Sequence, residues 1–170
     1  MYRKLEKELL AWKHQSSEEG RKPLLLHGAR QVGKTHLLKE LGRQAFEHVV
    51  YLNFETTPTM ASLFQGEIAP DHLVHDIELM TKTSVIPGKT LLILDEIQAS
   101  ERALTSLKYF CECMPELHVA AAGSLLGIAI HREHYSFPVG KVQSLYLYPM
   151  DFEEFLLACG EAGLAEEIRS

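Results

Sequence analysis

The sequence has no hydrophobic run long enough to cross a bilayer. Its longest apolar stretch, residues 119–130, is interrupted by Gly123, Ser124 and Gly127, whereas a transmembrane helix needs about 20 apolar residues in succession. Five of the first ten residues are charged, so the start of the chain lacks the apolar core of a signal peptide. We therefore expect a cytoplasmic protein without a membrane partner.

Cysteine and positive charge are also scarce. The 170 residues include 3 cysteines, an odd number without the spacing of a disulfide framework. The net charge of −6 argues against a broad nucleic-acid-binding face on this segment, although it leaves a local patch open. The length suffices for one domain with a core, and 46% hydrophobic and 24% charged residues are ordinary for a globular domain.

One glycine-rich segment fits the phosphate-binding pattern G-x-x-x-x-G-K-[ST] at every fixed position. It follows the apolar run 24–26 and opens a segment with helical periodicity, which is the strand, loop and helix context that the pattern requires. Backbone N–H groups of such a loop point at phosphates, Lys34 reaches the β- and γ-phosphates, and the Thr35 hydroxyl ligates Mg²⁺. The expected nucleotide-binding residues are Gly28, Ala29, Arg30, Gln31, Val32, Gly33, Lys34, Thr35 and His36.

A second motif places two acids after the strongest predicted strand. Residues 91–94 are apolar and Asp95 and Glu96 follow, which is typical of a buried parallel strand that emits carboxylates at the ligand-binding end of the sheet. We expect Asp95 to bind Mg²⁺ alongside Thr35, and Glu96 to be the base that polarises the attacking water. Glu55, at the end of another predicted strand, is a rival candidate for the base.

Two further polar residues stand at predicted strand ends. Ser124 follows the small, apolar residues 120–122 and would present a hydroxyl toward the γ-phosphate or the attacking water; the alternative is a serine that only completes a turn. Asn53 is a candidate to hydrogen-bond Glu96 and hold it away from water, or it is a simple strand-edge asparagine. We include both residues, with Lys34 and Glu96, in the candidate catalytic set.

Short apolar strands alternate with helical segments along the chain, which is typical of a parallel sheet covered on both faces. We predict a connector and N-terminal helix over 1–22, an α/β core over 23–158 and the start of a further C-terminal region over 159–170. A turn is expected at 56–59. The predicted strands are 24–27, 49–54, 90–94, 119–122 and 144–148, and the predicted helices are 2–15, one after the glycine-rich loop, two within 61–82, 101–113 and 152–158.

Several tracts together carry a family resemblance: Arg21–Thr35, Tyr51–Glu55, Asp95–Gln98, Gly123-Ser124, Phe137–Lys141 and Pro149–Phe155. They resemble the AAA+-type P-loop ATPases of bacteria and archaea that join this module to a C-terminal domain of unknown function. The resemblance implies a three-layer P-loop NTPase core of the additional-strand type, with a five-stranded, mostly parallel sheet. It also makes Ser124 similar to the family's sensor residue.

The resemblance is incomplete in two respects. The family usually has Gly-Arg where this chain has Gly140-Lys141, and a lysine lacks the bidentate fork of an arginine finger. The family's C-terminal domain does not follow in these residues, so we expect a fragment. A homo-oligomer or that C-terminal domain is expected to complete the site, and a protein or DNA is the expected target of the full-length protein.

We therefore predict an ATP-binding, Mg²⁺-dependent ATP-hydrolysing domain that couples nucleotide state to conformational change. The alternative is a nucleotide-binding signalling switch with little or no hydrolysis. A P-loop kinase would need a mobile lid with several arginines, and only Arg132 lies between Gly123 and Gly140. No Asn-Lys-x-Asp segment of the guanine-reading kind is present, which argues against a GTPase.

Overall fold

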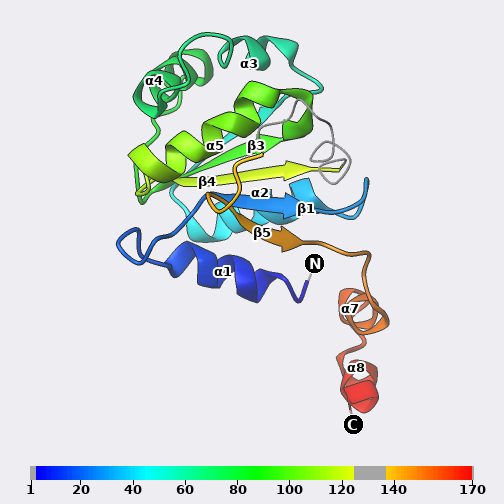
Figure 1. Ribbon diagram of the computed structural model, residues 1–170. Helices are drawn as coiled ribbons and strands as arrows, with labels where there is room; N and C mark the ends of the chain where they lie inside the picture. Colours follow the sequence, from blue (N-terminus) through cyan, green and yellow to red (C-terminus); the bar gives the residue numbers. More distant parts are fainter. Residues whose placement is uncertain (1–2, 125–136, 170) are drawn as a thin grey trace.

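The computed structural model describes residues 3–124 and 137–169 and shows a sheet between layers of helices (Figure 1). The strands of this sheet are β1 (Leu24–His27), β2 (His48–Asn53), β3 (Thr90–Asp95), β4 (His118–Gly123) and β5 (Gln143–Tyr146). They lie in the order β2-β3-β4-β1-β5, and every neighbouring pair is parallel. The predicted five-stranded α/β fold is confirmed, and the sheet in the described residues is wholly parallel.

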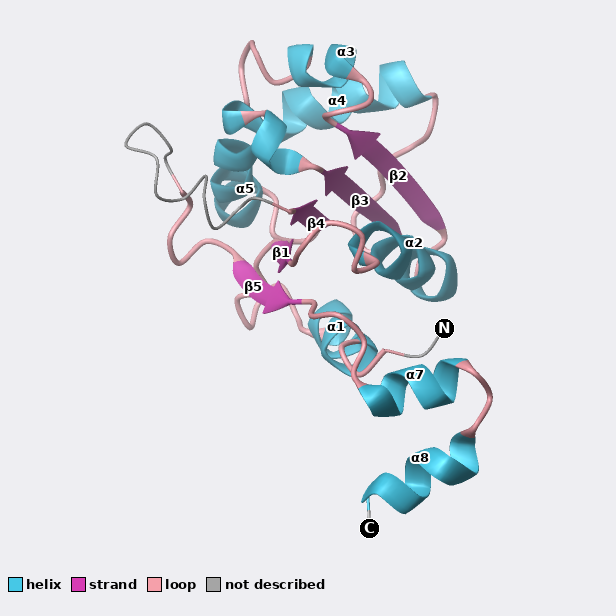
Figure 2. Ribbon diagram, turned by 90° about the vertical axis from the view of Figure 1, so that its right-hand side faces the viewer, coloured by secondary structure: helices cyan, strands magenta, loops and turns pink. Residues whose placement is uncertain are grey.

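Helical segments precede, connect and follow the strands. They are α1 (Glu6–His14), α2 (Lys34–Ala45), α3 (Pro58–Ser62), α4 (Pro70–Thr81), the 3-10 helix η1 (Ile97–Ala99), α5 (Glu101–Cys113), α7 (Phe152–Ala158) and α8 (Ala162–Arg169). The predicted helices 101–113 and 152–158 have the observed bounds. Three layers result, with α1 and α2 on one face of the sheet and α4 and α5 on the other (Figure 2).

The two faces follow from the alternation of side chains along each strand. Leu91 and Ile93 of β3 belong to the core under α1 and α2, and Leu92 and Leu94 belong to the core under α4 and α5. Alternate side chains of a strand point to opposite faces, so a strand covered on both sides must be apolar throughout. All residues of β3 and β4 are buried, which explains their uninterrupted apolar runs.

Two local predictions are wrong, and one short helix was not predicted. Helix α3 begins at Pro58, inside the predicted turn, because the fixed φ of proline suits the first position of a helix. Strand β5 ends at Tyr146, two residues before the predicted end. The segment after Glu96 forms η1, a short helix that no hydrophobic period indicated.

The C-terminal helices α7 and α8 extend away from the sheet beyond α1 (Figures 1 and 2). Asp151 begins α7 through a capping box, in which its carboxylate accepts from the Glu154 N–H at 2.8 Å while the Glu154 side chain accepts from the Asp151 N–H. Helix α8 packs against α7 through the buried Ala165. In the described residues, no helix has the length and hydropathy that a membrane span requires.

Candidate functional site

The topology brings three polar segments to one edge of the sheet. Strands β3, β4 and β1 are neighbours, and each is followed at its carboxyl end by a candidate segment: Glu96 after β3, Ser124 after β4, and the glycine-rich loop 28–35 after β1. Carboxyl ends of parallel strands are where open α/β sheets bind ligands. The fold therefore gathers motifs that lie far apart in the sequence.

The glycine-rich loop owes its shape to two glycines. A Cβ on Gly28 would lie 2.4 Å from the carbonyl oxygen of Leu147, so only glycine fits there. Gly33 adopts φ +100° and begins α2 without a side-chain cap. The first N–H groups of a helix have no partner within the helix, and here they face the loop that precedes them. This is the arrangement that binds anions at helix N-termini.

Lys34 is the first residue of α2, and its side chain turns back into the glycine-rich loop. Its ammonium group donates to the carbonyls of Gly28 at 2.9 Å and Ala29 at 2.6 Å, and the residue is 5% exposed. Burial lowers the pKa of Lys34, while the carboxylates of Glu96 and Asp95 act in the opposite direction. The site thus presents a partly desolvated positive charge where phosphates are expected.

Asp95 and Thr35 are brought together as predicted. The buried Asp95 carboxylate accepts from the Thr35 hydroxyl at 2.6 Å and from the Tyr51 hydroxyl at 2.7 Å, both at Oδ2. Its other oxygen accepts from the Glu96 N–H at 2.9 Å. Burial is the main cause that raises the pKa of Tyr51 to about 12, so this phenol stays a donor.

Tyr51 was not predicted as a site residue, because it lies inside β2 and the predicted site residues lie at strand ends. It lies two residues before Asn53, on the same side of β2, and β2 pairs with β3. A tyrosine at such a position beside an acidic strand end is the signal that would have identified it.

Glu96 has an unusual backbone and two side-chain partners. Its φ of 52° and ψ of 43° are left-handed, a conformation that costs energy in a residue other than glycine and gathers at functional sites. Its Oε2 atom accepts from Gln98 Nε2 at 2.6 Å and from Ser124 Oγ at 3.4 Å. Ser124 therefore lies beside Glu96, and Gln98 is an unpredicted neighbour.

Asn53 ends β2, and Glu55 lies two residues beyond it. The Asn53 amide donates to Tyr51 Oη at 3.1 Å, and its oxygen accepts from the N–H groups of Glu55 and Thr56. Within the described residues it makes no hydrogen bond to Glu96, because its amide N–H group, which could donate to a carboxylate, donates to Tyr51 instead. Glu55 pairs with the exposed Arg30 at 3.1 Å, at the rim of the site.

The remaining candidates occupy the loop and its surroundings. Gln31 has a left-handed φ of 62°, Val32 precedes Gly33, and His36 lies in the first turn of α2. Lys141 forms an ion pair with Glu112 of α5 at 3.1 Å. Arg132, the arginine that lies between Gly123 and Gly140 in the sequence, is outside the described residues.

The donor set around Asp95 suits Mg²⁺. In residues 3–124 and 137–169, no three His, Cys, Asp or Glu side chains gather as a metal cage. Mg²⁺ in nucleotide sites does not need one, because it takes one or two protein oxygens and completes its shell with phosphates and water. The Thr35 hydroxyl and Asp95 carboxylate supply such oxygens.

A parallel sheet with an uncapped helix after a glycine-rich loop, and acids at the carboxyl end of β3, defines a P-loop nucleotide-binding fold. Residues 20–156 match the family model described as AAA domain. The chain therefore belongs to the AAA domain family and is an AAA+ P-loop ATPase module. No curated protein matches it significantly.

Solved structures share the fold at low sequence identity. The Aeropyrum pernix ORC2 protein, in ADPNP–ADP complexes, is similar with a TM-score of 0.58 and 16% identity over 96% of this chain and 52% of that one. AMPPCP-bound DnaA from Aquifex aeolicus is similar with a TM-score of 0.52 and 16% identity over 92% of this chain and 48% of that one. C. elegans PCH-2 is similar with a TM-score of 0.51 and 15% identity over 91% of this chain and 44% of that one. The chain thus spans about half the length of these proteins.

Proposed function

We propose that this domain binds Mg²⁺–ATP, hydrolyses the β–γ anhydride and couples its nucleotide state to the conformation of a larger protein. The hydrogen bond from the Thr35 hydroxyl to the Asp95 carboxylate, at 2.6 Å, carries the proposal. It joins the two motifs, 60 residues apart, at the point where a P-loop ATPase needs its metal ligands. The AAA domain family supports nucleotide binding and hydrolysis in general.

Each part of the site has a defined task in this reaction. The N–H groups of the loop hold the phosphates, and Lys34 neutralises the β- and γ-phosphates after leaving the carbonyls of Gly28 and Ala29. Thr35 and Asp95 would hold Mg²⁺, which when bound neutralises charge on the phosphate oxygens. The Glu96 carboxylate takes the proton of the attacking water.

Two observations favour ATP over GTP as the nucleotide. The guanine-reading segment is missing from the sequence. Two of the structural neighbours were solved with adenine nucleotides or their analogues, which supports the same choice for this chain. A nucleotide-binding switch with little hydrolysis is the second candidate, favoured by the 2.6 Å hydrogen bond that engages the Glu96 carboxylate with Gln98.

Titration calorimetry with Mg²⁺–ATP tests the proposed site. We expect wild-type protein to bind and Lys34→Ala to lose most of its affinity while staying folded, because the loop then lacks its positive charge. Lys108→Ala removes an exposed lysine of α5 and is the charge-matched control. Unchanged affinity in folded Lys34→Ala would overturn the assignment of the site. Phosphate release by the wild-type protein then separates an ATPase from a switch.

A further inference from the structure

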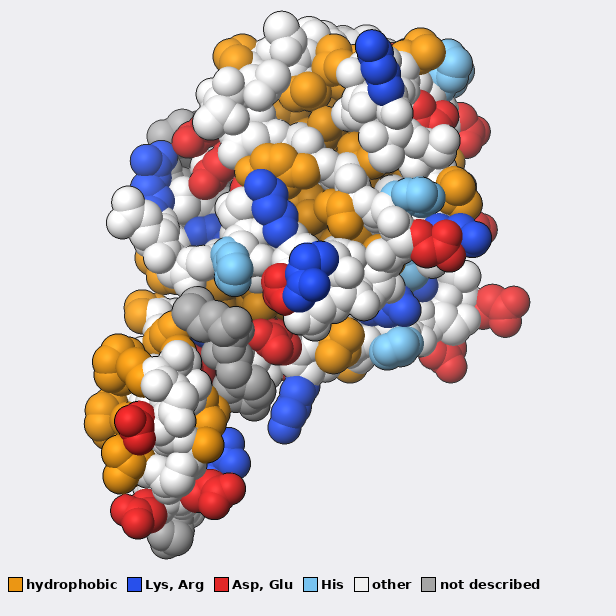
Figure 3. Space-filling model, turned by 180° about the vertical axis from the view of Figure 1, so that it is seen from behind, with side chains coloured by type: hydrophobic (Ala, Val, Ile, Leu, Met, Phe, Trp, Pro, Cys, Tyr) orange, Lys and Arg blue, Asp and Glu red, His pale blue; other side chains and the backbone are white. Residues whose placement is uncertain are grey.

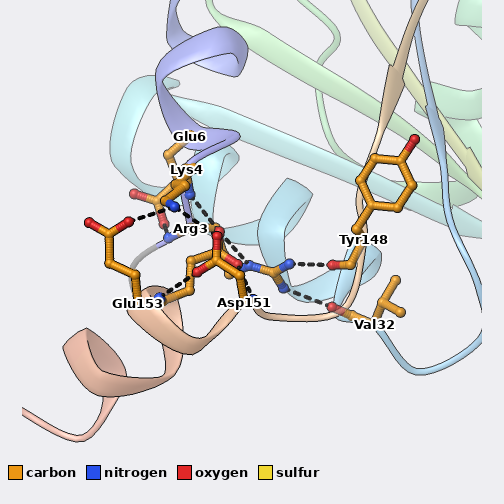
Figure 4. A network of polar contacts seen from close by, with 8 residues as sticks. Arg3, Lys4, Glu6, Val32, Tyr148, Asp151 and Glu153 are labelled. Atoms are coloured by element: carbon orange, nitrogen blue, oxygen red, sulfur yellow. Dashed lines mark hydrogen bonds and ion pairs between the residues drawn. The ribbon is translucent and has the colours of Figure 1, made fainter. Parts of the chain in front are cut away.

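A cluster of charged residues joins the segment before α1 to the start of α7 (Figure 4). The Lys4 ammonium lies 2.7 Å from Asp151 Oδ2 and 2.6 Å from Glu153 Oε2. The Lys4 N–H donates to Glu154 Oε1 at 2.8 Å, and Arg3 Nε lies 3.3 Å from the same oxygen. We call these five residues the clasp.

Arg3 also reaches the phosphate-binding loop. Its Nη1 donates to the carbonyl of Val32 at 3.0 Å and its Nη2 to the carbonyl of Tyr148 at 2.5 Å. Val32 is the residue before Gly33, and a Cβ on Gly33 would lie 3.8 Å from Arg3 Nη1. One guanidinium therefore contacts both the loop that enters α2 and the linker that enters α7 (Figure 4).

This contact is buried, unlike the lysine contacts beside it. The side chains of Arg3 and Glu154 are 4% and 8% exposed, whereas that of Lys4 is 48% exposed. Exposed ion pairs contribute little, but removing one partner of a buried pair leaves an uncompensated charge and is strongly unfavourable. The rigid fork of a guanidinium can serve several acceptors at once, which an ammonium does not do in the same geometry.

Helices α7 and α8 contribute no residue to either of the two hydrophobic core clusters of the described residues. They stand away from the sheet (Figures 1 and 2), and Phe152 and Phe155 of α7 are 65% and 53% exposed. Leu164 and Ile168 of α8 are also exposed, and hydrophobic side chains gather over this helix pair in Figure 3. Elements with few buried apolar contacts to the core are the ones that move most easily.

We propose that Arg3 is a positioning residue for nucleotide binding, which fixes the Val32 carbonyl of the loop and, through Glu154, links the loop to the placement of α7 and α8. The inference rests on the proposed ATP binding at Lys34 and Thr35. Coupling between two sites is reciprocal. Nucleotide in the loop therefore shifts the helix pair, and loosening the helix pair weakens nucleotide binding.

Conservative variants at both ends of the contact test the link. Arg3→Lys keeps the charge and loses the fork, and Glu154→Gln removes the opposite charge with little change in volume. Lys4→Met breaks the exposed ion pairs of the clasp without touching the loop, and is the matched control. We expect the dissociation constant of Mg²⁺–ATP, measured by calorimetry, to rise about tenfold in each of the first two variants and to stay within about twofold in Lys4→Met.

A fluorophore on Cys159 reports the helix pair directly. Cys159 follows α7 and is exposed, and replacing Cys111 and Cys113 by serine leaves it as the single thiol. We expect Mg²⁺–ATP to change the emission or anisotropy of this label in the wild-type background and in Lys4→Met. The change should be absent in Arg3→Lys and in Glu154→Gln at saturating nucleotide.

The outcomes separate this inference from the proposed function. Variants Arg3→Lys and Glu154→Gln that bind ATP as wild type does, or that keep the Cys159 response, overturn the inference and leave the function standing. An equal loss in Lys4→Met also overturns it, because the effect then belongs to the clasp charge and not to Arg3. If Arg3→Lys does not fold, Glu154→Gln decides. A wild-type protein that does not bind ATP overturns the proposed function, and the inference with it.

Discussion

Glu96 and Glu55 stand at neighbouring strand ends but in different surroundings. The Glu96 carboxylate lies beside Ser124 and Gln98, whereas Glu55 pairs with an exposed arginine at the rim. Glu96→Gln keeps the volume and removes the proton acceptor, so we expect ATP to bind while turnover falls by about 10²-fold or more. Phosphate release and calorimetry measure the two effects. Turnover that survives in Glu96→Gln and disappears in Glu55→Gln would identify Glu55 as the base.

Tyr51 connects the Asp95 carboxylate to β2 through a single hydroxyl. It donates to Asp95 at 2.7 Å and accepts from Asn53 at 3.1 Å. Tyr51→Phe removes one hydrogen bond to a charged group, so we expect the Mg²⁺ concentration for half-maximal ATP binding to shift by about three- to tenfold. Titrations of ATP at a series of Mg²⁺ concentrations measure it. Tyr109→Phe on α5 is the control, and an equal shift there would remove the role given to Tyr51.

At the scale of elements, the loop between β1 and α2 is fixed by its approach to the segment after β5. A Cβ at position 28 would meet the carbonyl of Leu147 at 2.4 Å, whereas a Cβ on Gly66 meets nothing within 4 Å. We expect Gly28→Ala to lower stability by about 1–3 kcal/mol and to abolish the rise in melting temperature that Mg²⁺–ATP produces. Gly66→Ala should leave both the stability and the ATP-dependent rise in melting temperature as they are in the wild-type protein. Thermal melts with and without nucleotide decide, and a Gly28→Ala protein that still responds to ATP contradicts this role of the loop.

The elements that sequence predicted best are those whose signal is local. Helices α5 and α7 show a hydrophobic period after a capping side chain, and β1 begins with three buried leucines just before the glycine-rich loop. Helix α3 has five residues and none of them is buried, so it carries no apolar stripe to read. The contact of Arg3 with Glu154 joins residues 151 positions apart and depends on how α7 returns to α1. No local pattern contains that information.

At the scale of the whole molecule, buried histidines make stability depend on pH. His118 is 4% exposed, and its Nε2 lies 2.9 Å from the carbonyl of Lys13. Burial is the main cause that lowers its pKa to about 4, against about 6.5 in an unfolded chain. Between these values the unfolded state takes up a proton that the folded state does not, so stability is complete above about pH 6.5 and falls toward pH 4, by up to about 3 kcal/mol.

Urea unfolding at pH 7.5 and pH 4.5 measures this loss. His118→Gln keeps a donor for the Lys13 carbonyl and cannot titrate. The difference in the free energy of unfolding between pH 7.5 and pH 4.5 should therefore be smaller in this variant. A residual slope is expected, because burial also lowers the pKa of His27. His48→Gln at an exposed position is the control. A His118→Gln protein with the full wild-type slope would show that another group causes it.

Catalysis by the whole molecule depends on positive charge around the γ-phosphate. Every arginine in residues 3–124 and 137–169 already has a protein partner, and the one within the loop, Arg30, faces Glu55. An arginine supplied by a neighbouring subunit can raise phosphoryl transfer by about 10³–10⁵-fold. We therefore expect this chain, when dilute, to bind ATP and to turn over well below the roughly 1–100 s⁻¹ typical of kinases. The rate per chain should rise when the protein is concentrated enough to associate, which phosphate release and light scattering measure together over a concentration series. A dilute monomer with a fast rate that is independent of concentration would mean that these residues hold the complete catalytic site.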